Sequence, residues 1–340
     1  MRSEPGLAAD GIRGSNGRAR SVSAQTDDPE AGVFAKPADP FAQRNSTNPL
    51  PRPAWCSVPI PLGADEKLQA MQRLLSKQKL NSVCRSARCP NIAHCFSRET
   101  VTFMVLGAVC TRNCLFCAVT KGMPEPLDEG EPGRIAEAVS ALKLRHAVIT
   151  SVTRDDLGDG GATHFSRVTE AVRMKRPQAA VELLVPDFQG SPDSLQTIVR
   201  ANPDIVGHDM ETVQRMFKAV RKEASFKRSL DLLGTVKQLN GSLLTKSGFM
   251  VGLGEEEKEV LELLSQLRDA RCDIVTIGQY LRPSASQIPV REYVQPGQFA
   301  FYQAKALEMG FRAALSGPLV RSSFNASELL EGIRSGSTRH

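Results

Sequence analysis

Apolar and polar positions alternate in a repeating order from Val101 onwards. Short apolar runs with the composition of β-strands occur at residues 101–107, 146–152, 180–186, 204–208, 243–253, 273–279 and 312–317. Between them lie stretches in which apolar residues recur at helical spacing, for example 134–145, 163–176, 211–222, 255–271 and 296–309. Strands that alternate with helices at this interval predict an α/β fold with a parallel sheet and helices outside it.

The expected form of this sheet is a partial (β/α) barrel. A full eightfold barrel and an open doubly wound sheet would give the same alternation, so the pattern alone leaves both open. In a barrel, reactive groups gather at the carboxyl ends of the strands. The segment that follows the first predicted strand is therefore a candidate site.

The first hundred residues follow a different pattern. Residues 1–50 are polar, rich in Gly and Pro and without apolar periodicity, which predicts a disordered extension; a transit peptide is the alternative, but the acidic residues in this stretch are atypical of one. Residues 51–63 read as an extended strap punctuated by prolines, and residues 65–79 have helical spacing. We therefore divide the chain into the extension (1–50), the strap with a cysteine loop (51–100), the barrel (101–320) and a C-terminal segment (321–340).

Composition and charge exclude several classes of function. The formal net charge of +6 comes from Lys and Arg residues that are spread along the chain, and one Trp and three Tyr residues leave little for bases to stack on, so no nucleic-acid partner is expected. The sequence has no run of 18 apolar residues and no secretory signal, which predicts a soluble, cytoplasmic protein without a membrane partner. The absence of heptads and long edge strands predicts a monomer.

Six of the eight cysteines form two triplets of different spacing, Cys84-x4-Cys89-x5-Cys95 and Cys110-x3-Cys114-x2-Cys117. A disulfide framework does not fit a chain of this length in a reducing compartment. Three cysteines on one loop can direct three thiolates at a common centre, as a cubic iron–sulfur cluster requires, while leaving one iron without a side chain. Structural zinc is the alternative, although it usually takes four ligands in two short pairs.

The second triplet resembles the signature of the radical S-adenosylmethionine superfamily. Both triplets together, within CPNIAHCF and FMVLGAVCTRNCLFCAV, resemble the lipoyl synthase family. The same resemblance continues in TSVTRDDLGDGGATHF (150–165), VELLVPDFQG (181–190), TKSGFMVGLGE (245–255), TIGQYLRPS (276–284) and GPLVRSSF (317–324). It covers roughly residues 50 to 330 and implies a partial (β/α)6-type barrel with an N-terminal cysteine-loop extension and a C-terminal closing segment.

The resemblance also implies an activity. Lipoyl synthases insert two sulfur atoms, at carbons 6 and 8, into an octanoyl chain that is amide-linked to a lysine of a carrier protein, and they consume two S-adenosylmethionine molecules for each lipoyl group. The implied cofactors are S-adenosylmethionine and two 4Fe-4S clusters. The implied partners are octanoylated lipoyl carrier domains (acyltransferase subunits of 2-oxoacid dehydrogenases and the H protein of glycine cleavage), a ferredoxin or flavodoxin electron donor, and an iron–sulfur carrier.

By the same resemblance, the six cysteines divide between two clusters. Cys110, Cys114 and Cys117 correspond to the ligands of the radical-generating cluster, whose open iron binds S-adenosylmethionine. The first triplet corresponds to an auxiliary cluster that supplies sulfur, and its fourth ligand in the family falls on Ser323 of the Arg-Ser-Ser-Phe segment. Without the resemblance, Ser323 would read as part of a polar turn.

Further candidates for cofactor binding lie at strand ends. Thr150, Ser151 and Arg154 begin a Gly-rich loop that is typical of either a ligand site or a solvated turn. Glu182 lies inside an apolar strand, where a carboxylate is costly unless it faces a ligand or belongs to a buried ion pair. The remaining candidates for S-adenosylmethionine are His208, Asp209 and Lys246.

Gln279 and Tyr280 are the candidates for the octanoyl entry, and core packing at a strand-to-loop transition is the alternative. Outside the triplets, Cys272 at the start of an apolar strand is expected to be a small buried hydrophobic residue. No ligand role is implied for Cys56.

The chain departs from the family pattern at several positions. Phe324 replaces a tyrosine, Asp209 an asparagine and Gln287 a histidine. Arg85 and Ser86 replace a typically acidic pair after the first cysteine, and His94 replaces an acidic residue before Cys95, which makes the surroundings of the first triplet more positive. That charge would either raise the potential of the cluster or attract an acidic partner surface.

Three other functions compete with this interpretation: a radical sulfur-inserting enzyme with another substrate, a two-cluster electron carrier, and a zinc-stabilised binding module. The first is disfavoured by the C-x4-C-x5-C triplet and the Arg-Ser-Ser-Phe segment. Metal analysis separates the others, because two cubic clusters contain about eight irons.

Overall fold

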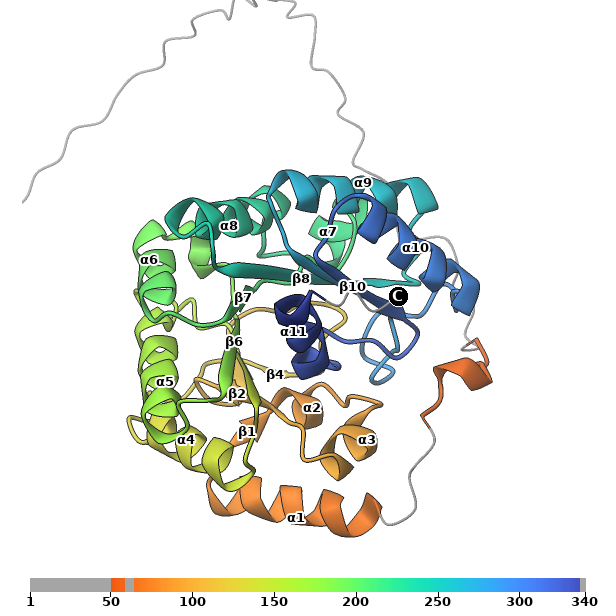
Figure 1. Cartoon of the computed structure of the whole chain (residues 1–340). Helices are drawn as coiled ribbons and strands as arrows, with labels where there is room; N and C mark the ends of the chain where they lie inside the picture. Colours follow the sequence, from red (N-terminus) through yellow and green to blue (C-terminus); the bar gives the residue numbers. More distant parts are fainter. Residues whose placement is uncertain (1–49, 59–63, 337–340) are drawn as a thin grey trace, which may run out of the picture. The chain divides into compact units, whose positions relative to one another are not determined.

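The computed structural model describes residues 50–58 and 64–336 of the chain (Figure 1). The predicted disorder of residues 1–50 falls almost entirely outside the described residues, as does the end of the C-terminal segment at 337–340. None of the described helices is long and apolar enough to cross a membrane.

One curved sheet organises the described part of the chain. Its strands follow the order β1 (Asn81–Ser82), β2 (Thr102–Val105), β5 (His146–Ser151), β6 (Ala180–Leu184), β7 (Ile205–Gly207), β8 (Leu244–Val251), β9 (Ile274–Gln279) and β10 (Ala313–Gly317). The strands from β2 to β10 run parallel, and only β1 is antiparallel to its neighbour. Within the described residues β1 and β10 do not pair with each other, so hydrogen bonds do not close the sheet into a ring.

The predicted alternation of strands and helices is confirmed. Each strand from β2 to β9 is followed by a covering helix, in the order α4 (Glu131–Ala141), α5 (Ala162–Lys175), α6 (Pro192–Arg200), α7 (Gln214–Val220) with α8 (Phe226–Leu239), α9 (Glu257–Asp269) and α10 (Pro296–Glu308). These six strand–helix units match the predicted repeat, and β10 adds one further parallel strand. Figure 1 shows α4, α5, α6, α8, α9 and α10 along the outer face of the sheet.

The elements before β2 belong to the cysteine-loop extension. Besides β1, they are the 3-10 turn η1 (Ala54–Cys56), α1 (Ala64–Lys77), α2 (Val83–Ser86) and α3 (Ile92–Ser97). Two further pieces lie in loops: a small sheet of β3 (Val109–Cys110) with β4 (Thr120–Lys121), and the turn η2 (Phe188–Gly190).

The main core lies between the sheet and the outer helices, because alternate strand residues such as Val181, Leu183, Val275 and Ile277 point towards the helices. A second, smaller core lies at the amino ends of the strands. There α11 (Ala326–Ser335) buries Leu330 against the first residues of four strands, Ala180, Ile205, Leu244 and Ile274. Helix α11 therefore covers the amino end of the sheet.

Residues 318–325 connect β10 to α11 through the inside of the barrel. Along this path the segment contacts β9 at Gly278, β8 at Gly248 and β2 at Thr102. The inner face of the sheet is thus lined partly by a segment of the chain itself, which agrees with the predicted closing segment.

Candidate metal centres

The second cysteine triplet follows the carboxyl end of β2. After this strand the chain turns through Leu106 and Gly107, whose φ angles are 69° and 95°, and it reaches Cys110 in β3. A backbone hydrogen bond of 2.9 Å from Leu115 N to Val220 O fixes the loop against the end of α7. This is the position at which a barrel gathers reactive groups.

The thiols of Cys110, Cys114 and Cys117 are free and half-buried, and they lie within electrostatic range of one another. Burial raises the pKa of Cys114 to about 11 and also raises that of Cys117. Because only thiolates bind iron, loading a cluster here displaces protons from these thiols.

A row of alternating charges supports this loop. The Arg112 guanidinium donates to Asp155 at 2.6 Å and to the fully buried Asp187 at 2.6 Å, and Arg228 of α8 donates to the other oxygen of Asp187 at 2.8 Å. Burial would raise the pKa of Asp187, but Arg112 outweighs it and holds the pKa well below its ordinary value. Since Arg112 N also approaches Cys110 Sγ at 3.4 Å, the row ties the cysteine loop to the loops after β5 and β6.

A polar pocket of about 390 Å³ lies beside this row of charges. Its walls come from residues 155–158 and 160 after β5 and from residues 188–191 in and after η2. The Gly-rich loop that begins at Thr150 therefore forms one wall of a pocket.

The loop after β9 covers the second triplet. Gln287 Nε2 donates to Cys117 O at 3.4 Å, and Ile288 N donates to Leu115 O at 3.2 Å. Tyr280 donates its hydroxyl to Ile288 O at 2.7 Å, which anchors the same loop.

Gln279 also anchors this loop. Its amide nitrogen donates to Tyr280 O and Glu292 O at 3.0 and 2.9 Å, and its oxygen accepts from Val294 N at 2.9 Å. Both residues predicted at the octanoyl entry therefore hold the loop after β9, and their contact with substrate stays a prediction.

The first triplet lies at the opposite end of β2. Cys84 in α2 lies within hydrogen-bonding reach of Thr102, the first residue of that strand. Cys89 and Cys95 are close enough to Cys84 to interact with it electrostatically. Burial raises the pKa of Cys84 to about 11 and that of Cys95 to about 12, so these thiols are protonated at neutral pH when metal is absent.

Thr102 also links the first triplet to Ser323. The Thr102 hydroxyl donates to Ser323 Oγ at 2.7 Å while the same residue contacts Cys84. The hydroxyl of Ser323, which follows β10 in the sequence, thus lies beside the cysteine loop that precedes β2.

Two further contacts join the same segments. Asn91, between Cys89 and Cys95, donates its side-chain amide to Leu319 O at 2.6 Å. The His94 ring stacks on Phe324, with centroids 6.2 Å apart and planes 29° apart. His94 and Phe324 are both departures from the family pattern, and the structure places them in contact with each other.

The donor sets suit clusters better than single ions. Within the described residues, no three His, Cys, Asp or Glu side chains are arranged to hold one metal ion. Thiolates that hold a cubic cluster bind different irons and stand farther apart than the ligands of one zinc. Two groups of three free thiols, one of them beside a serine hydroxyl, fit this chemistry.

Thr150, Ser151 and Arg154 occupy the end of β5 and the loop beyond it. Thr150 Oγ1 donates to Leu184 O at 2.9 Å, whereas Ser151 Oγ is buried without a partner. Arg154 forms an ion pair with Asp156 at 2.8 Å and donates to Leu106 O at 3.1 Å, so it braces the turn that leads to the second triplet. Ser151 is the member of this group with a free polar atom.

Glu182 and Lys246 form a fully buried ion pair of 2.8 Å between β6 and β8. His146 Nε2 lies 3.1 Å from the other carboxylate oxygen, without the geometry of a hydrogen bond. Burial would raise the pKa of Glu182, but Lys246 and His146 outweigh it and lower the pKa to about 2. The ion pair that was one of two explanations for Glu182 is therefore present.

His208 and Asp209 follow β7 but face different surroundings. Both ring nitrogens of His208 are engaged, Nδ1 with Val185 O at 2.8 Å and Nε2 with Ser229 Oγ of α8 at 2.9 Å. Burial lowers the pKa of His208 to about 4, so the ring is neutral at pH 7. Asp209 instead accepts a short hydrogen bond from Ser322 in the closing segment.

Glu211 is a site residue that the sequence did not reveal. Burial raises its pKa to about 8, and the neighbouring Asp209 adds to this effect. Glu211 also lies within electrostatic range of Arg321 and of the thiols of Cys114 and Cys117. In the sequence, only its position just after a strand, like that of Asp209, could have indicated a functional residue.

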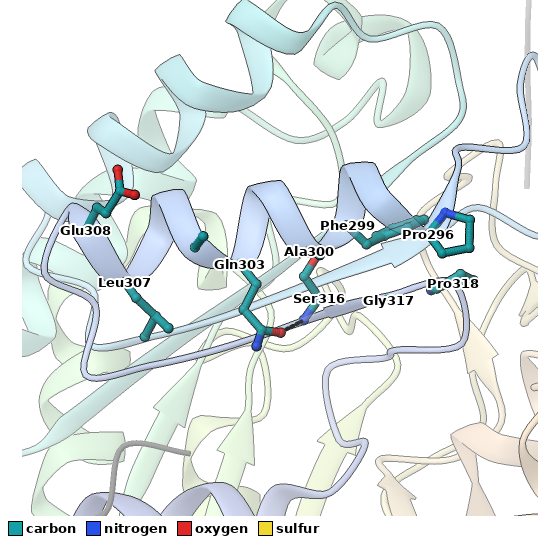
Figure 2. A pocket seen from close by; sticks show the side chains of 10 residues that line it. Pro296, Phe299, Ala300, Gln303, Leu307, Glu308, Ser316, Gly317 and Pro318 are labelled. Atoms are coloured by element: carbon teal, nitrogen blue, oxygen red, sulfur yellow. Dashed lines mark hydrogen bonds between the residues drawn. The ribbon is translucent and has the colours of Figure 1, made fainter. Parts of the chain in front are cut away.

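A groove of about 530 Å³ lies apart from both triplets, between α10 and the edge strand β10 (Figure 2). Gln303 reaches across it from α10 and accepts a hydrogen bond of 3.0 Å from Ser316 N. This contact satisfies a backbone donor of the open sheet edge.

Comparisons with known proteins place the sequence of this chain among known families. The family model of the radical SAM superfamily matches residues 104–267. A solved structure of a methylornithine synthase superposes with a TM-score of 0.48 at 11% identity, covering 81% of this chain and 96% of that one. The assignment to a family rests on sequence relatives.

Two of these relatives are named lipoyl synthase. The protein from Caldanaerobacter subterraneus subsp. tengcongensis is 53% identical over 275 residues, which is 81% of this chain and 95% of that protein. The protein from Caldicellulosiruptor bescii is 48% identical over 288 residues, 84% of this chain and 98% of that protein. At this identity over nearly the whole length of these relatives, the chain belongs to the lipoyl synthase family.

Proposed function

We propose that this chain converts octanoyl groups on lipoyl carrier domains into lipoyl groups through two 4Fe-4S clusters, one held by each cysteine triplet. Membership of the radical SAM superfamily implies one such cluster and S-adenosylmethionine. The second cluster is our inference, and one observation carries it: Thr102 contacts both Cys84 and Ser323, so three thiols and a hydroxyl from distant parts of the chain meet at one place.

The second triplet holds the radical-generating cluster. Cys110, Cys114 and Cys117 would hold this cluster, which would supply one electron for the reductive cleavage of S-adenosylmethionine into methionine and a radical able to take hydrogen from a methylene that has no acidic proton. Arg112 holds the cysteine loop in position, and the Gln287–Ile288 loop covers it. Ser151 offers an unpartnered hydroxyl to the cofactor. Because both ring nitrogens of His208 are engaged, we leave that residue out of the cofactor contacts.

The first triplet and Ser323 hold the cluster that supplies sulfur. A serine alkoxide is a harder and less usual iron ligand than a thiolate. We propose that its loss during turnover helps to free the sulfur. A Ser323→Cys variant would then retain iron but lose sulfur insertion, and full activity of that variant would contradict the role of ligand loss.

The proposed chemistry requires an electron donor and a protein that rebuilds the cluster. An electron must be supplied for each radical, which calls for a ferredoxin or flavodoxin donor. The sacrificed cluster must be rebuilt, which calls for an iron–sulfur carrier. Free thiols at both triplets suit a reducing compartment, so we propose that the enzyme acts in the cytoplasm. We also propose that it is a monomer.

Anaerobic mass spectrometry tests the proposal. The iron- and sulfide-reconstituted protein is given S-adenosylmethionine, a reductant and an octanoyl-lysine carrier peptide. We expect peptides that carry one and then two sulfur atoms, and about eight irons per chain.

Replacing Cys84, Cys89 and Cys95 by alanine should leave about four irons and the formation of 5'-deoxyadenosine, but no sulfur product. Cys272→Ala, which removes a buried thiol outside both triplets, is the matched control and should behave like the parent. Formation of 5'-deoxyadenosine without any change in the peptide would show that the substrate is wrong. About four irons in the parent protein would remove the second cluster from the proposal.

A further inference from the structure

We propose that Asp209, Gly248 and Gly278 form a docking track that holds residues 320–323 inside the barrel and thereby positions Ser323 at the first cysteine triplet. The inference rests on the proposed function, which makes Ser323 a cluster ligand. Asp209 follows β7, whereas Gly248 and Gly278 lie within the neighbouring strands β8 and β9.

Asp209 supplies the polar contact of the track. Its Oδ2 accepts a short hydrogen bond from Ser322 Oγ, which joins residues 113 positions apart in the sequence. Breaking this hydrogen bond would leave a hydroxyl and a carboxyl group without this partner inside the barrel, which costs free energy. Asp209 therefore fixes the residue directly before Ser323.

Gly248 supplies the space for Ser322. A Cβ at this position would lie 2.7 Å from Ser322 Oγ, 2.7 Å from Thr276 Oγ1 and 2.8 Å from Asp209 Oδ1. Gly248 has an ordinary strand conformation inside β8, so its backbone does not require glycine. A side chain does not fit here because Ser322 of the closing segment, together with Thr276 and Asp209, fills the space.

Gly278 has the same function one strand further along. A Cβ there would collide with the carbonyl oxygen of Val320 and lie 3.1 Å from Arg321 Nη1. Because the first of these is a backbone atom, the segment could not move away by changing a rotamer. The two glycines thus bring residues 320–322 directly against the inner face of the sheet.

Ser323 lies in the same turn as Ser322, so the contacts of Ser322 also limit the position of Ser323. Phe324 N donates to Arg321 O at 2.9 Å and closes a turn around the two serines. Within it the Ser322 hydroxyl points to Asp209, whereas Ser323 Oγ accepts from Thr102 on the opposite strand β2. Losing the contact of Ser322 would leave Ser323 held from one side only.

Hydrogen exchange of the metal-free full-length protein tests the track without any cluster. Ser322→Ala and Gly248→Ala should each accelerate exchange in the peptide that covers residues 318–325 by about tenfold or more. Gly133→Ala is the matched control, because a Cβ at that exposed helical position meets nothing within 4 Å. Parental exchange in both test variants would overturn the track.

A second measurement connects the track to the ligand. After reconstitution with iron-57, the Mössbauer spectrum of the auxiliary cluster in Ser322→Ala, Gly248→Ala and Asp209→Leu should match that of Ser323→Ala. Asp209→Asn should keep the parental spectrum, because its amide oxygen still accepts from Ser322. A parental far-UV circular dichroism spectrum of each variant shows that the barrel remains folded.

The possible failures are distinguishable. If Ser323→Ala alone alters the spectrum, the ligand assignment stands and the docking track is wrong. If Ser323→Ala has the parental spectrum, the ligand assignment is wrong. The docking track then does not position a cluster ligand.

Discussion

Glu182 is a charged residue in the middle of an otherwise apolar strand, and its neighbours make this position tolerable. Lys246 lies 2.8 Å away on β8, and His146 lies 3.1 Å away on β5. A buried carboxylate without such partners would favour its neutral form. The pKa of about 2 shows that Glu182 is instead held as an anion.

This pair predicts a pH dependence of folding. The pKa of Glu182 falls from 4.5 to about 2 in the folded protein, so its contribution to stability is complete above pH 4.5 and is lost as the pH falls towards 2. The loss should be about 3 kcal/mol. Urea unfolding of the metal-free protein between pH 5 and 2 measures it. The Glu182→Gln/Lys246→Met double variant should show a shallower slope, and an equal slope would contradict the assignment.

At the residue scale, the sequence identified candidate positions better than it identified contacts. Glu182 stood out because a carboxylate is unexpected in an apolar run. Glu211 did not, since its neighbours Arg321 and Cys117 come from loops that only the fold brings together. For the same reason the contacts of Gln279 with the loop after its own strand could not be predicted.

The cysteine loop depends on other elements for its shape. Arg112 joins it to the loops after β5 and β6 through Asp155 and Asp187, and Arg228 joins Asp187 to α8. Asp187 is fully buried, so it depends on both arginines for charge balance.

Arg112→Met should therefore lower the free energy of unfolding by about 3–5 kcal/mol, because it leaves a buried carboxylate with only one partner. Arg112→Lys should rescue little, since an ammonium group cannot reproduce a fork that reaches two carboxylates. Arg228→Met should cost less, because Arg228 is partly exposed and Asp187 keeps Arg112. Urea unfolding checks the order, and equal losses for the two arginines would contradict it.

Helix α11 is held mainly by apolar burial rather than by its ion pairs. Leu330→Ala should cost about 2–5 kcal/mol, because Leu330 fills the space between the first residues of four strands. Arg334→Ala should cost less than about 1 kcal/mol, because its pair with Asp204 is largely exposed on the arginine side. The shift in urea midpoint measures both, and a larger effect of Arg334→Ala would show that charge holds the helix.

Elements with a regular pattern of apolar residues could be predicted from the sequence. The runs at 146–152, 180–186 and 273–279 became β5, β6 and β9 because both faces of these strands are buried. β1 gave no signal, since two residues, Asn81 and Ser82, are too few for a period and become a strand only by pairing with β2. The path of residues 318–325 through the barrel could not be predicted either, because its contacts are all distant in sequence.

For the molecule as a whole, the two triplets stand at opposite ends of β2. Cys110 follows the end of this strand, and Cys84 contacts its first residue, Thr102. Four residues of strand span about 10 Å. We expect that carbons 6 and 8 of an acyl chain held between these ends would each lose hydrogen on one side and receive sulfur on the other.

Iron at the first triplet should also stabilise both chain segments that it joins. Reconstituted protein should exchange amide hydrogens in residues 84–97 and 318–325 at least about tenfold more slowly than metal-free protein, with little change in β5 to β8. Exchange followed by mass spectrometry measures this. In a variant with alanine at Cys84, Cys89 and Cys95, iron should have no such effect; protection that persisted there would come from elsewhere.

The path of residues 318–325 also sets an order in time. Every strand that this segment touches, from β2 to β9, is translated before the segment itself. A nascent chain can thus assemble the sheet and the first cysteine loop while Ser323 and α11 have not yet emerged from the ribosome. The three thiols of that loop are therefore exposed before Ser323 is available, and this order of translation allows metal delivery to precede the final insertion of the closing segment.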